Sequence, residues 1–367
     1  MSALYLIPYE LNGGVHGGKI RAQNLAKAFR SYFSELLIVT PDKISRAKQA
    51  YPDWLEILPV EVASDIRMLF TEYNFEKINL EKYETVIFEQ PWYWNSIKQI
   101  NAQKIYSSQN LEWKLKNEVL KNYAGNEIGK IVTYLRDLEI EIAKNVDLVI
   151  AVTEEEANWY RHVGARNVIV VPNGTNNKIC SEMGNTGNNG LKNQAYTLVV
   201  GSAHPPNIAG CINFLGHPAL WLPPDQNLVI AGSLGSAMFS IWESDMNSRP
   251  GNIHLTGEID DEELSNLIEN CNSICLPVDY GAGSNLKTAE ALVSGRPIVS
   301  TESAFRGYES FMNEKNIVIA REAIDFKLGI MHFMWNKFPN VSRHNSMTLT
   351  WDEIIKVLVL NLKDQHV

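Results

Sequence analysis

Residues 273–307 constrain the fold of this chain more than any other part of the sequence. The apolar run 274–278 has the length and residue types of a buried parallel strand, and residues 297–301 repeat the pattern. A glycine-rich segment and a short helix with an apolar stripe are predicted between them. Gly295 followed by Pro297 predicts the end of that helix. This order of elements is typical of an α/β fold, in which ligands bind at the carboxyl ends of the strands.

Polar residues gather where this helix begins. Gly281, Gly283 and Ser284 precede it, and backbone N–H groups at a helix N-terminus favour an anion that glycines allow to approach closely. Lys287 follows in the first turn, and Glu290 lies three residues later on the same face. A carboxylate at that place can accept hydrogen bonds from a ribose diol. The pattern therefore predicts a nucleotide, with phosphate at Lys287 and ribose at Glu290; the alternative is a surface ion pair of little energetic value.

Strands and helices alternate along the whole chain. The strands predicted in the first half lie at residues 4–8, 36–40, 85–89, 104–108, 148–153 and 168–172. Those in the second half lie at residues 197–201, 228–231, 253–256, 274–278, 298–301 and 317–320. Such alternation is typical of doubly wound, Rossmann-like domains. The Asn- and Gly-rich segment between the two sets predicts a linker.

These patterns divide the chain into two domains. The chain has 367 residues, more than a domain with a single hydrophobic core usually has. We expect a first domain at residues 1–174, a linker at 175–194 and a second domain at 195–345. The last helical stretch, within residues 346–367, is expected to pack back on the first domain.

Composition limits the function classes. A net charge of −9 argues against nucleic-acid binding, which needs a basic face. The four cysteines show neither disulfide nor zinc spacing and are interpreted as reduced thiols, and no segment has transmembrane length. We expect a cytoplasmic protein without a metal or cofactor, and contact with the inner face of a membrane stays open. The lysines of the helix predicted at residues 111–121 are interpreted as a solvated face, and Trp92 as a packing residue.

A known family shares these motifs. GSNLKTAEAL, SGRPIVST and AFRG at residues 283–307 resemble the donor-binding signature of family 4 glycosyltransferases. The rest of the chain agrees in order, with GGVHGG at 13–18, YSSQNLEWKLK at 106–116, VVGSAHPPN at 199–207 and LTGEIDDEEL at 255–264. The resemblance implies the GT-B fold, two Rossmann-like domains facing a cleft, and metal-independent, retaining transfer from a nucleotide sugar.

The resemblance also implies roles for individual residues. Lys287 would stabilise charge on the departing phosphate, and Glu290 would bind the ribose. The expected phosphate-binding residues are Gly17, Gly18, Gly283, Ser284, Asn285, Leu286 and Lys287. The expected base contacts are Glu258 and Ile259, and the expected sugar or acceptor contacts are His16, Gln109, Asn110 and Asn207.

Three positions depart from the family pattern. The family has two glutamates eight positions apart, and the corresponding residues here are Ala282 and Glu290. Only the ribose-binding glutamate is therefore present. Gln109 stands where the family often has a histidine. The basic pair after the first strand of the second domain is absent, which leaves Lys287 to carry that charge alone.

The function predicted is transfer of a sugar from a nucleoside-diphosphate sugar to a glycan, lipid-linked or small-molecule acceptor held by the first domain. The departing phosphate would accept the acceptor's proton, so no protein base is needed. A catalytically inactive relative that binds a nucleotide sugar or a protein is the main alternative. An epimerase would need acid/base groups that the sequence does not place, and a dehydrogenase would need the spaced GxGxxG that GGVHGG lacks.

Overall fold

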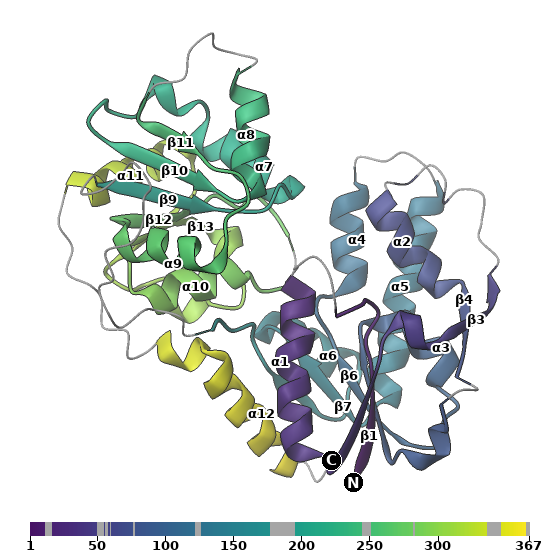
Figure 1. Cartoon of the computed structure of the whole chain (residues 1–367). Helices are drawn as coiled ribbons and strands as arrows, with labels where there is room; N and C mark the ends of the chain where they lie inside the picture. The colour runs from purple at the N-terminus through teal and green to yellow at the C-terminus, as the bar shows by residue number, and fades with distance from the viewer. Residues whose placement is uncertain are drawn as a thin grey trace. The chain divides into compact units, whose positions relative to one another are not determined.

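The computed structural model divides the chain into two compact units, which we describe separately. Unit 1 comprises Met1–Pro172 and Asp352–Val367, and unit 2 comprises Asn173–Trp351 (Figure 1). The residues described are 1–11, 17–49, 55, 58, 60–75, 78–121, 126–176, 195–243, 251–281, 283–335 and 346–364. Most of the linker expected at 175–194, namely 177–194, lies outside these residues, as do His16 and Ala282.

Unit 1 is built on a six-stranded parallel sheet in the order β2-β1-β5-β6-β7-β8. The strands are β1 (Ser2–Leu6), β2 (Glu35–Val39), β5 (Thr85–Glu89), β6 (Gln103–Ser107), β7 (Leu148–Ala151) and β8 (Val168–Val170). The sequence did not predict the antiparallel pair β3 (Ser45–Gln49) and β4 (Thr71–Asn74). The order of the main sheet reverses between β1 and β5, so the loops after these strands border its ligand crevice.

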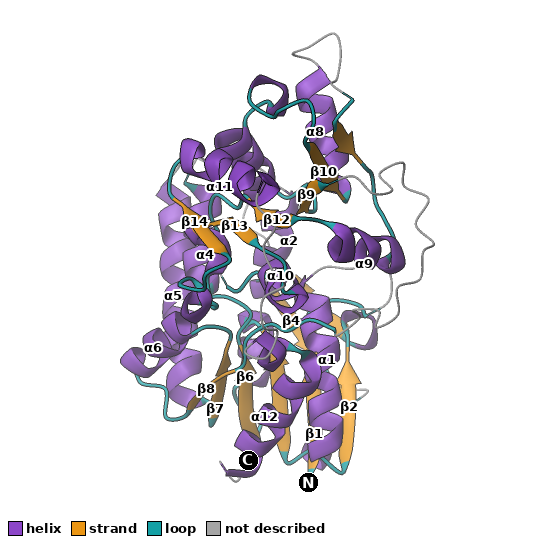
Figure 2. Cartoon of the chain, turned by 90° about the vertical axis from the view of Figure 1, so that its left-hand side faces the viewer, coloured by secondary structure: helices purple, strands orange, loops and turns teal. Residues whose placement is uncertain are grey.

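Helices cover the sheet of unit 1 on both faces (Figure 2). They are α1 (Gly17–Tyr32), α2 (Val60–Leu69), α3 (Trp94–Ile97), α4 (Glu112–Leu120), α5 (Asn126–Asn145), α6 (Glu154–Val163) and α12 (Trp351–Asp364). Trp92 is 3% exposed and belongs to the apolar cluster beside the sheet, which confirms its expected packing role.

Unit 2 repeats the architecture in the order β11-β10-β9-β12-β13-β14, again entirely parallel. The strands are β9 (Tyr196–Val200), β10 (Asn227–Ala231), β11 (Ile253–Leu255), β12 (Ser273–Leu276), β13 (Ile298–Thr301) and β14 (Ile317–Ala320). The helices are α7 (Pro205–Gly210), α8 (Ser233–Glu243), α9 (Asp261–Asn270), α10 (Leu286–Ser294) and α11 (Ala323–Trp335). The order reverses between β9 and β12, so the glycine-rich loop after β12 borders the crevice of this sheet.

Every strand predicted from the sequence belongs to one of these two sheets, so the α/β, doubly wound class is confirmed. In unit 2, alternate residues of each central strand belong to apolar clusters on opposite faces of the sheet. On β12, Ile274 and Leu276 join one cluster and Cys275 joins the other. A strand buried on both faces needs a continuous apolar run, which is why these strands could be recognised.

The C-terminal helix α12 belongs to unit 1. Leu358 and Leu362 are fully buried, and the Tyr32 hydroxyl of α1 donates a hydrogen bond to the Leu362 carbonyl at 3.2 Å. Thr175 and Thr350 form a parallel bridge, with Thr175 N–H donating to Leu349 O and Trp351 N–H donating to Thr175 O, both at 2.9 Å. The two chain segments that join the units therefore run side by side.

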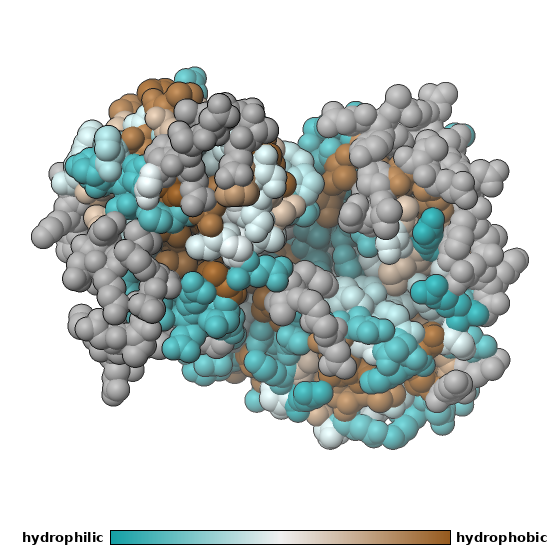
Figure 3. All heavy atoms as spheres, turned by 45° about the horizontal axis from the view of Figure 1, so that its top comes forward, coloured by the Kyte–Doolittle hydropathy of each residue, from teal (hydrophilic) through white to brown (hydrophobic). Residues whose placement is uncertain are grey.

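The surface mixes hydrophilic and apolar groups, as the teal and brown side chains in Figure 3 show. None of the described helices is both long and apolar enough to cross a bilayer. On α11, Ile324, Leu328 and Trp335 each expose more than half of their surface while the opposite side of the helix is buried.

Candidate functional site

The loop between β12 and α10 has a backbone that only glycine adopts readily. Gly281 has φ 151° and Gly283 has φ 69°. A Cβ atom on Gly281 would also lie 2.6 Å from Nη2 of Arg306. Both glycines are therefore required by their backbone conformation, and at Gly281 a larger residue would also displace the end of the Arg306 side chain.

Helix α10 begins as the sequence predicted. Asn285 is its N-cap, and the Asn285 side chain accepts a hydrogen bond from the Lys287 backbone N–H at 3.2 Å. Gly295, with φ 71°, ends the helix in the left-handed conformation. The Thr288 hydroxyl donates to Ala304 O at 2.6 Å and so anchors the first turn of α10 to the segment after β13.

Ser284 is tied to the start of unit 2 by two hydrogen bonds. The Ser284 hydroxyl accepts from Asn173 N–H, and the Ser284 carbonyl accepts from Asn173 Nδ2, both at 3.4 Å. Asn173 O in turn accepts from the Tyr308 hydroxyl at 2.8 Å. The loop is thus held in place, and the helix-start N–H of Lys287 is occupied by a cap rather than open to a ligand.

Lys287 and Glu290 are both half-buried on α10. The alternative of a surface ion pair is not observed, because no carboxylate of the described residues pairs with Lys287 Nζ. The pKa of the Glu290 carboxyl is raised, chiefly by burial. The positive charge of Lys287 lowers this pKa, and the negative charge of Asp261 raises it further. Glu290 therefore lies within electrostatic reach of both Lys287 and the start of α9.

Arg306 is a site residue that the sequence analysis did not assign. The Arg306 guanidinium donates to the carbonyl of Ser303 and, at 3.4 Å, to the carbonyl of Gly283, and it fills the space beside Gly281. Lys287 is consequently not the only cation next to the loop. The AFRG motif after β13 was the signal, but its arginine had been used only as part of the resemblance.

Loops after the neighbouring strands carry the other expected contacts of unit 2. Asn207 Nδ2 donates to Ser202 O at 3.0 Å, so this amide shapes the loop after β9. Glu258 is exposed and Ile259 half-buried in the loop after β11. This loop ends at Asp260, which caps α9 by accepting from Glu263 N–H at 2.8 Å. Glu258 and Ile259 therefore precede the same helix that brings Asp261 near Glu290.

In unit 1, Gln109 is held by internal contacts. Gln109 Nε2 donates to Glu89 Oε2 at 2.9 Å and to the Tyr9 hydroxyl, and Tyr9 donates to Gly18 O at 2.6 Å. A Cβ atom on Gly18 would lie 2.3 Å from Gln109 Oε1. Gln109 thus joins the carboxyl end of β5 to the start of α1, where Gly17 is the first residue.

Buried ionisable groups surround this network. Arg21 is 1% exposed and donates to Val171 O at 2.8 Å. Burial lowers the pKa of Arg21, and the nearby carboxylates of Glu89 and Glu156 raise it. Burial also raises the pKa of Glu89. It raises the pKa of Glu156 to about 7. No sequence pattern predicted that these charged groups are buried together.

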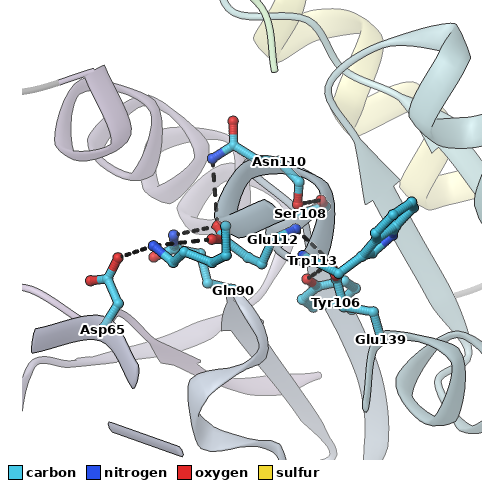
Figure 4. A network of polar contacts seen from close by, with 9 residues as sticks. Asp65, Gln90, Tyr106, Ser108, Asn110, Glu112, Trp113 and Glu139 are labelled. Atoms are coloured by element: carbon cyan, nitrogen blue, oxygen red, sulfur yellow. Dashed lines mark hydrogen bonds and ion pairs between the residues drawn. The ribbon is translucent and has the colours of Figure 1, made fainter. Parts of the chain in front are cut away.

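A second polar cluster lies where β5 and β6 end (Figure 4). Glu112 Oε1 accepts from Gln90 Nε2 at 2.9 Å and from Asn110 Nδ2 at 3.5 Å. Lys116 Nζ lies 2.5 Å from Asp65 Oδ2 and 3.8 Å from Glu112 Oε2. The side chains of Lys116 and Glu112 are 6% and 1% exposed, so the expectation that α4 presents all its lysines to solvent is wrong for Lys116.

Glu139 of α5 caps α4. Its carboxyl oxygens accept from Trp113 N–H at 3.0 Å, from Glu112 N–H at 3.2 Å and from the Tyr160 hydroxyl at 3.1 Å. Burial raises the pKa of Glu139 to about 8, against the lowering effect of the two backbone donors. The pKa of Glu139 is lower in the unfolded chain, so at neutral pH the native state binds one proton more than the unfolded state. This extra proton stabilises the native state, and the stabilisation is lost as pH rises through 8.

We expect Glu139→Gln to flatten the pH dependence of stability. Between pH 6 and pH 9 the parent should lose on the order of 2 kcal/mol more of its free energy of unfolding than the variant. Urea midpoints at both pH values measure this difference. Asp137→Asn, an exposed change on the same helix, is the control. An equal decline in Glu139→Gln and parent would show that Glu139 does not titrate in this range.

Comparisons with known proteins show what the chain is similar to. Residues 194–331 match the family model for glycosyl transferases group 1. No curated protein sequence matches the chain significantly. Among solved structures, sucrose-phosphate synthase from Thermosynechococcus elongatus has a TM-score of 0.68 at 16% identity, over 99% of both chains. Anabaena Alr3699/HepE in complex with UDP has a TM-score of 0.61 at 11% identity, over 99% of this chain and 100% of that one.

A trehalose-phosphate synthase (UDP-forming) from Burkholderia xenovorans, in complex with glucose-6-phosphate, also has a TM-score of 0.61, at 11% identity over 100% of both chains. At these identities the likeness concerns the fold. The fold shared by the chain and these proteins is GT-B.

Proposed function

Because residues 194–331 match a glycosyl transferase domain within a GT-B fold, we propose that the protein is a retaining, metal-independent glycosyltransferase of the family 4 type. It moves a sugar from a nucleoside-diphosphate sugar to a glycan, lipid-linked or small-molecule acceptor held by unit 1. One observation carries the proposal: a glycine loop at the switch point of the unit 2 sheet leads into a helix whose Lys287 has no ion-pair partner among the described residues.

The charges of unit 2 suit the departing group. Breaking the anomeric bond puts negative charge on the diphosphate, and Lys287, Arg306 and the N-terminus of α10 are positive groups fixed around one loop. Glu290 accepts hydrogen bonds from the ribose hydroxyls. The departing phosphate takes the acceptor's proton, so the transfer needs no protein base.

The structural neighbours support the substrate classes. One is solved with UDP and another with glucose-6-phosphate, that is, with a nucleotide and with a sugar. We propose a nucleotide sugar and a sugar-like acceptor for this chain, acting in the cytoplasm. Burial of Cys211, Cys271 and Cys275 as free thiols supports that location.

A catalytically inactive relative is the second candidate. The amide of Gln109, at the position of the family's histidine, contacts Glu89 and Tyr9, and this favours a structural role there. Such a protein would bind a nucleotide sugar, or a partner protein, without transferring the sugar.

Calorimetric titration of the whole chain with UDP, GDP, dTDP and ADP tests the proposal. We expect micromolar binding of one nucleoside diphosphate, followed by binding of its sugar derivatives. NMR of the product's anomeric proton then shows whether configuration is retained. Absence of binding to all four nucleotides would overturn the donor site, and donor binding without transfer or hydrolysis would favour the inactive relative.

A further inference from the structure

The glycine-rich loop before α10 is held by side chains from two other segments of unit 2. Asn173 Nδ2 donates to the carbonyl of Ser284, and Arg306 Nε donates to the carbonyl of Gly283, both at 3.4 Å. Asn173 lies 111 residues before Ser284, and Arg306 lies 23 residues after Gly283. Two successive peptide carbonyls of the loop are therefore each fixed by a side chain from outside it.

These two contacts also set the direction of the next two N–H groups. In a planar trans peptide the N–H points opposite to the C=O of the same unit. The Ser284 N–H shares a unit with the Gly283 carbonyl, and the Asn285 N–H shares one with the Ser284 carbonyl. Both N–H groups consequently point away from the side chains of Asn173 and Arg306. No described residue accepts a hydrogen bond from either N–H.

The hydroxyl of Ser284 is oriented by the same neighbour. It accepts a hydrogen bond from the Asn173 backbone N–H at 3.4 Å. An N–H group only donates, so the hydroxyl hydrogen of Ser284 must point elsewhere. No described residue accepts that hydrogen, and Ser284 is half-buried rather than fully enclosed. The loop thus has a third donor that can serve a ligand.

Tyr308 in turn supports Asn173. The Tyr308 hydroxyl donates to the Asn173 carbonyl at 2.8 Å, and Tyr308 is 1% exposed. Tyr308 follows Arg306 by two residues, so the segment after β13 supports the loop directly at Gly283 and, through Asn173, at Ser284. A side chain as buried as that of Tyr308 does not contact a ligand. Its effect on binding must therefore pass through its neighbours.

The three donors suit an anion. The oxygens of an ionised phosphate only accept hydrogen bonds, and such bonds are stronger than those between neutral groups. Lys287, the second residue of α10, adds a positive charge directly after the loop. The diphosphate of a nucleotide sugar therefore matches the loop in both hydrogen bonding and charge.

We propose that Asn173 and Tyr308 are positioning residues for the donor diphosphate. They act through Ser284, because they direct its hydroxyl and the adjoining N–H groups to one phosphate group. Arg306 acts in the same way on the peptide unit before Ser284. This inference rests on the proposed donor site, and it adds two residues that the sequence analysis did not assign to that site.

Tyr308→Phe tests the support of Asn173, because it removes one hydroxyl and keeps the ring. UDP, GDP, dTDP and ADP are titrated by calorimetry, each beside its own nucleoside. We expect the diphosphate Kd to rise about 5-fold, the equivalent of one neutral hydrogen bond, while the nucleoside Kd stays unchanged. The ratio of the two Kd values is the readout, because a general loss of stability would not alter it.

Tyr196→Phe is the matched control. The Tyr196 hydroxyl also donates to a backbone carbonyl of unit 2, that of Leu267, at 2.7 Å, and Tyr196 is 3% exposed. Its loss should lower the unfolding temperature about as much as Tyr308→Phe does, while both Kd values stay at those of the parent. If the Kd ratio in Tyr308→Phe also stayed at the parent's, Tyr308 would have no positioning role.

Asn173→Ala and Ser284→Ala, alone and together, show whether Asn173 acts through Ser284. Asn173→Ala removes the amide that holds the Ser284 carbonyl, although the backbone N–H at this position remains. We expect each single variant to raise the diphosphate Kd about 5-fold, and the double variant to raise it well below the product of about 25-fold. The full product would place the effect of Asn173 outside Ser284 and overturn the proposal.

Failure of the proposed function would look different. The parent would then bind none of the four nucleoside diphosphates, and the positioning roles would fall with the donor site. If the parent bound a diphosphate and both Tyr308→Phe and Asn173→Ala kept its Kd ratio, only the positioning roles would be overturned.

Discussion

Lys287→Ala is expected to weaken the binding of nucleoside diphosphates by about 10- to 100-fold while leaving the affinity for the matching nucleoside nearly unchanged. A hydrogen bond to a charged group contributes about 1.5–3 kcal/mol. No carboxylate of the described residues pairs with the Lys287 ammonium, so its full charge is available to a phosphate. Calorimetry with the diphosphate and the nucleoside on parent and variant measures both affinities.

Glu290→Ala supplies the comparison, because its partner would be the ribose that both ligands share. This variant should weaken binding of diphosphate and nucleoside alike. Lys315→Ala, a lysine elsewhere in unit 2, controls for loss of charge alone. Equal binding by parent, Lys287→Ala and Glu290→Ala would remove the donor site from this helix.

Gly210→Ala is expected to destabilise unit 2 by about 3 kcal/mol or more and to abolish nucleotide binding. A Cβ atom on Gly210 would lie 1.6 Å from the carbonyl oxygen of Pro277, a backbone atom that cannot move without displacing the loop after β12. Overpacking against a rigid neighbour usually costs about 1–3 kcal/mol, and here the overlap is deep. Thermal unfolding and nucleotide titration report the two losses.

Gly251→Ala is the matched control, because a Cβ atom at Gly251 meets no other atom within 4 Å. This variant should unfold at nearly the parent's temperature and bind nucleotide normally. If Gly210→Ala behaved in the same way, α7 would not pack against the loop after β12 as closely as described.

The local pattern of apolar residues was enough to predict the strands of the two six-stranded sheets. Strands such as β12 and β13 are buried on two faces, so their residues form continuous apolar runs that differ from the helices between them. The start and end of α10 were also predictable, because Asn285 and Gly295 act through contacts a few residues away. β3 and β4 lack such a run and escaped prediction.

Contacts between distant segments could not be predicted in this way. The sequence places Lys116 among the solvated lysines of α4, and its burial depends on Asp65, 51 residues earlier. The contacts of the Gln109 amide with Glu89 and Tyr9 also join distant segments and were not predicted, and the expected ligand contact of Gln109 stays a prediction. The hydrogen bond from Gln90 to Glu112, 22 residues later, likewise depends on the tertiary fold.

The passage of α12 back to unit 1 sets an order for assembly on the ribosome. Unit 2 is a continuous segment, Asn173–Trp351, and all of it leaves the ribosome before the helix that completes unit 1. Until then the surface that buries Leu358 and Leu362 stays uncovered. The first domain to be made is thus the last to be finished, and a nascent chain stopped before Trp351 would carry an exposed apolar surface that chaperones recognise.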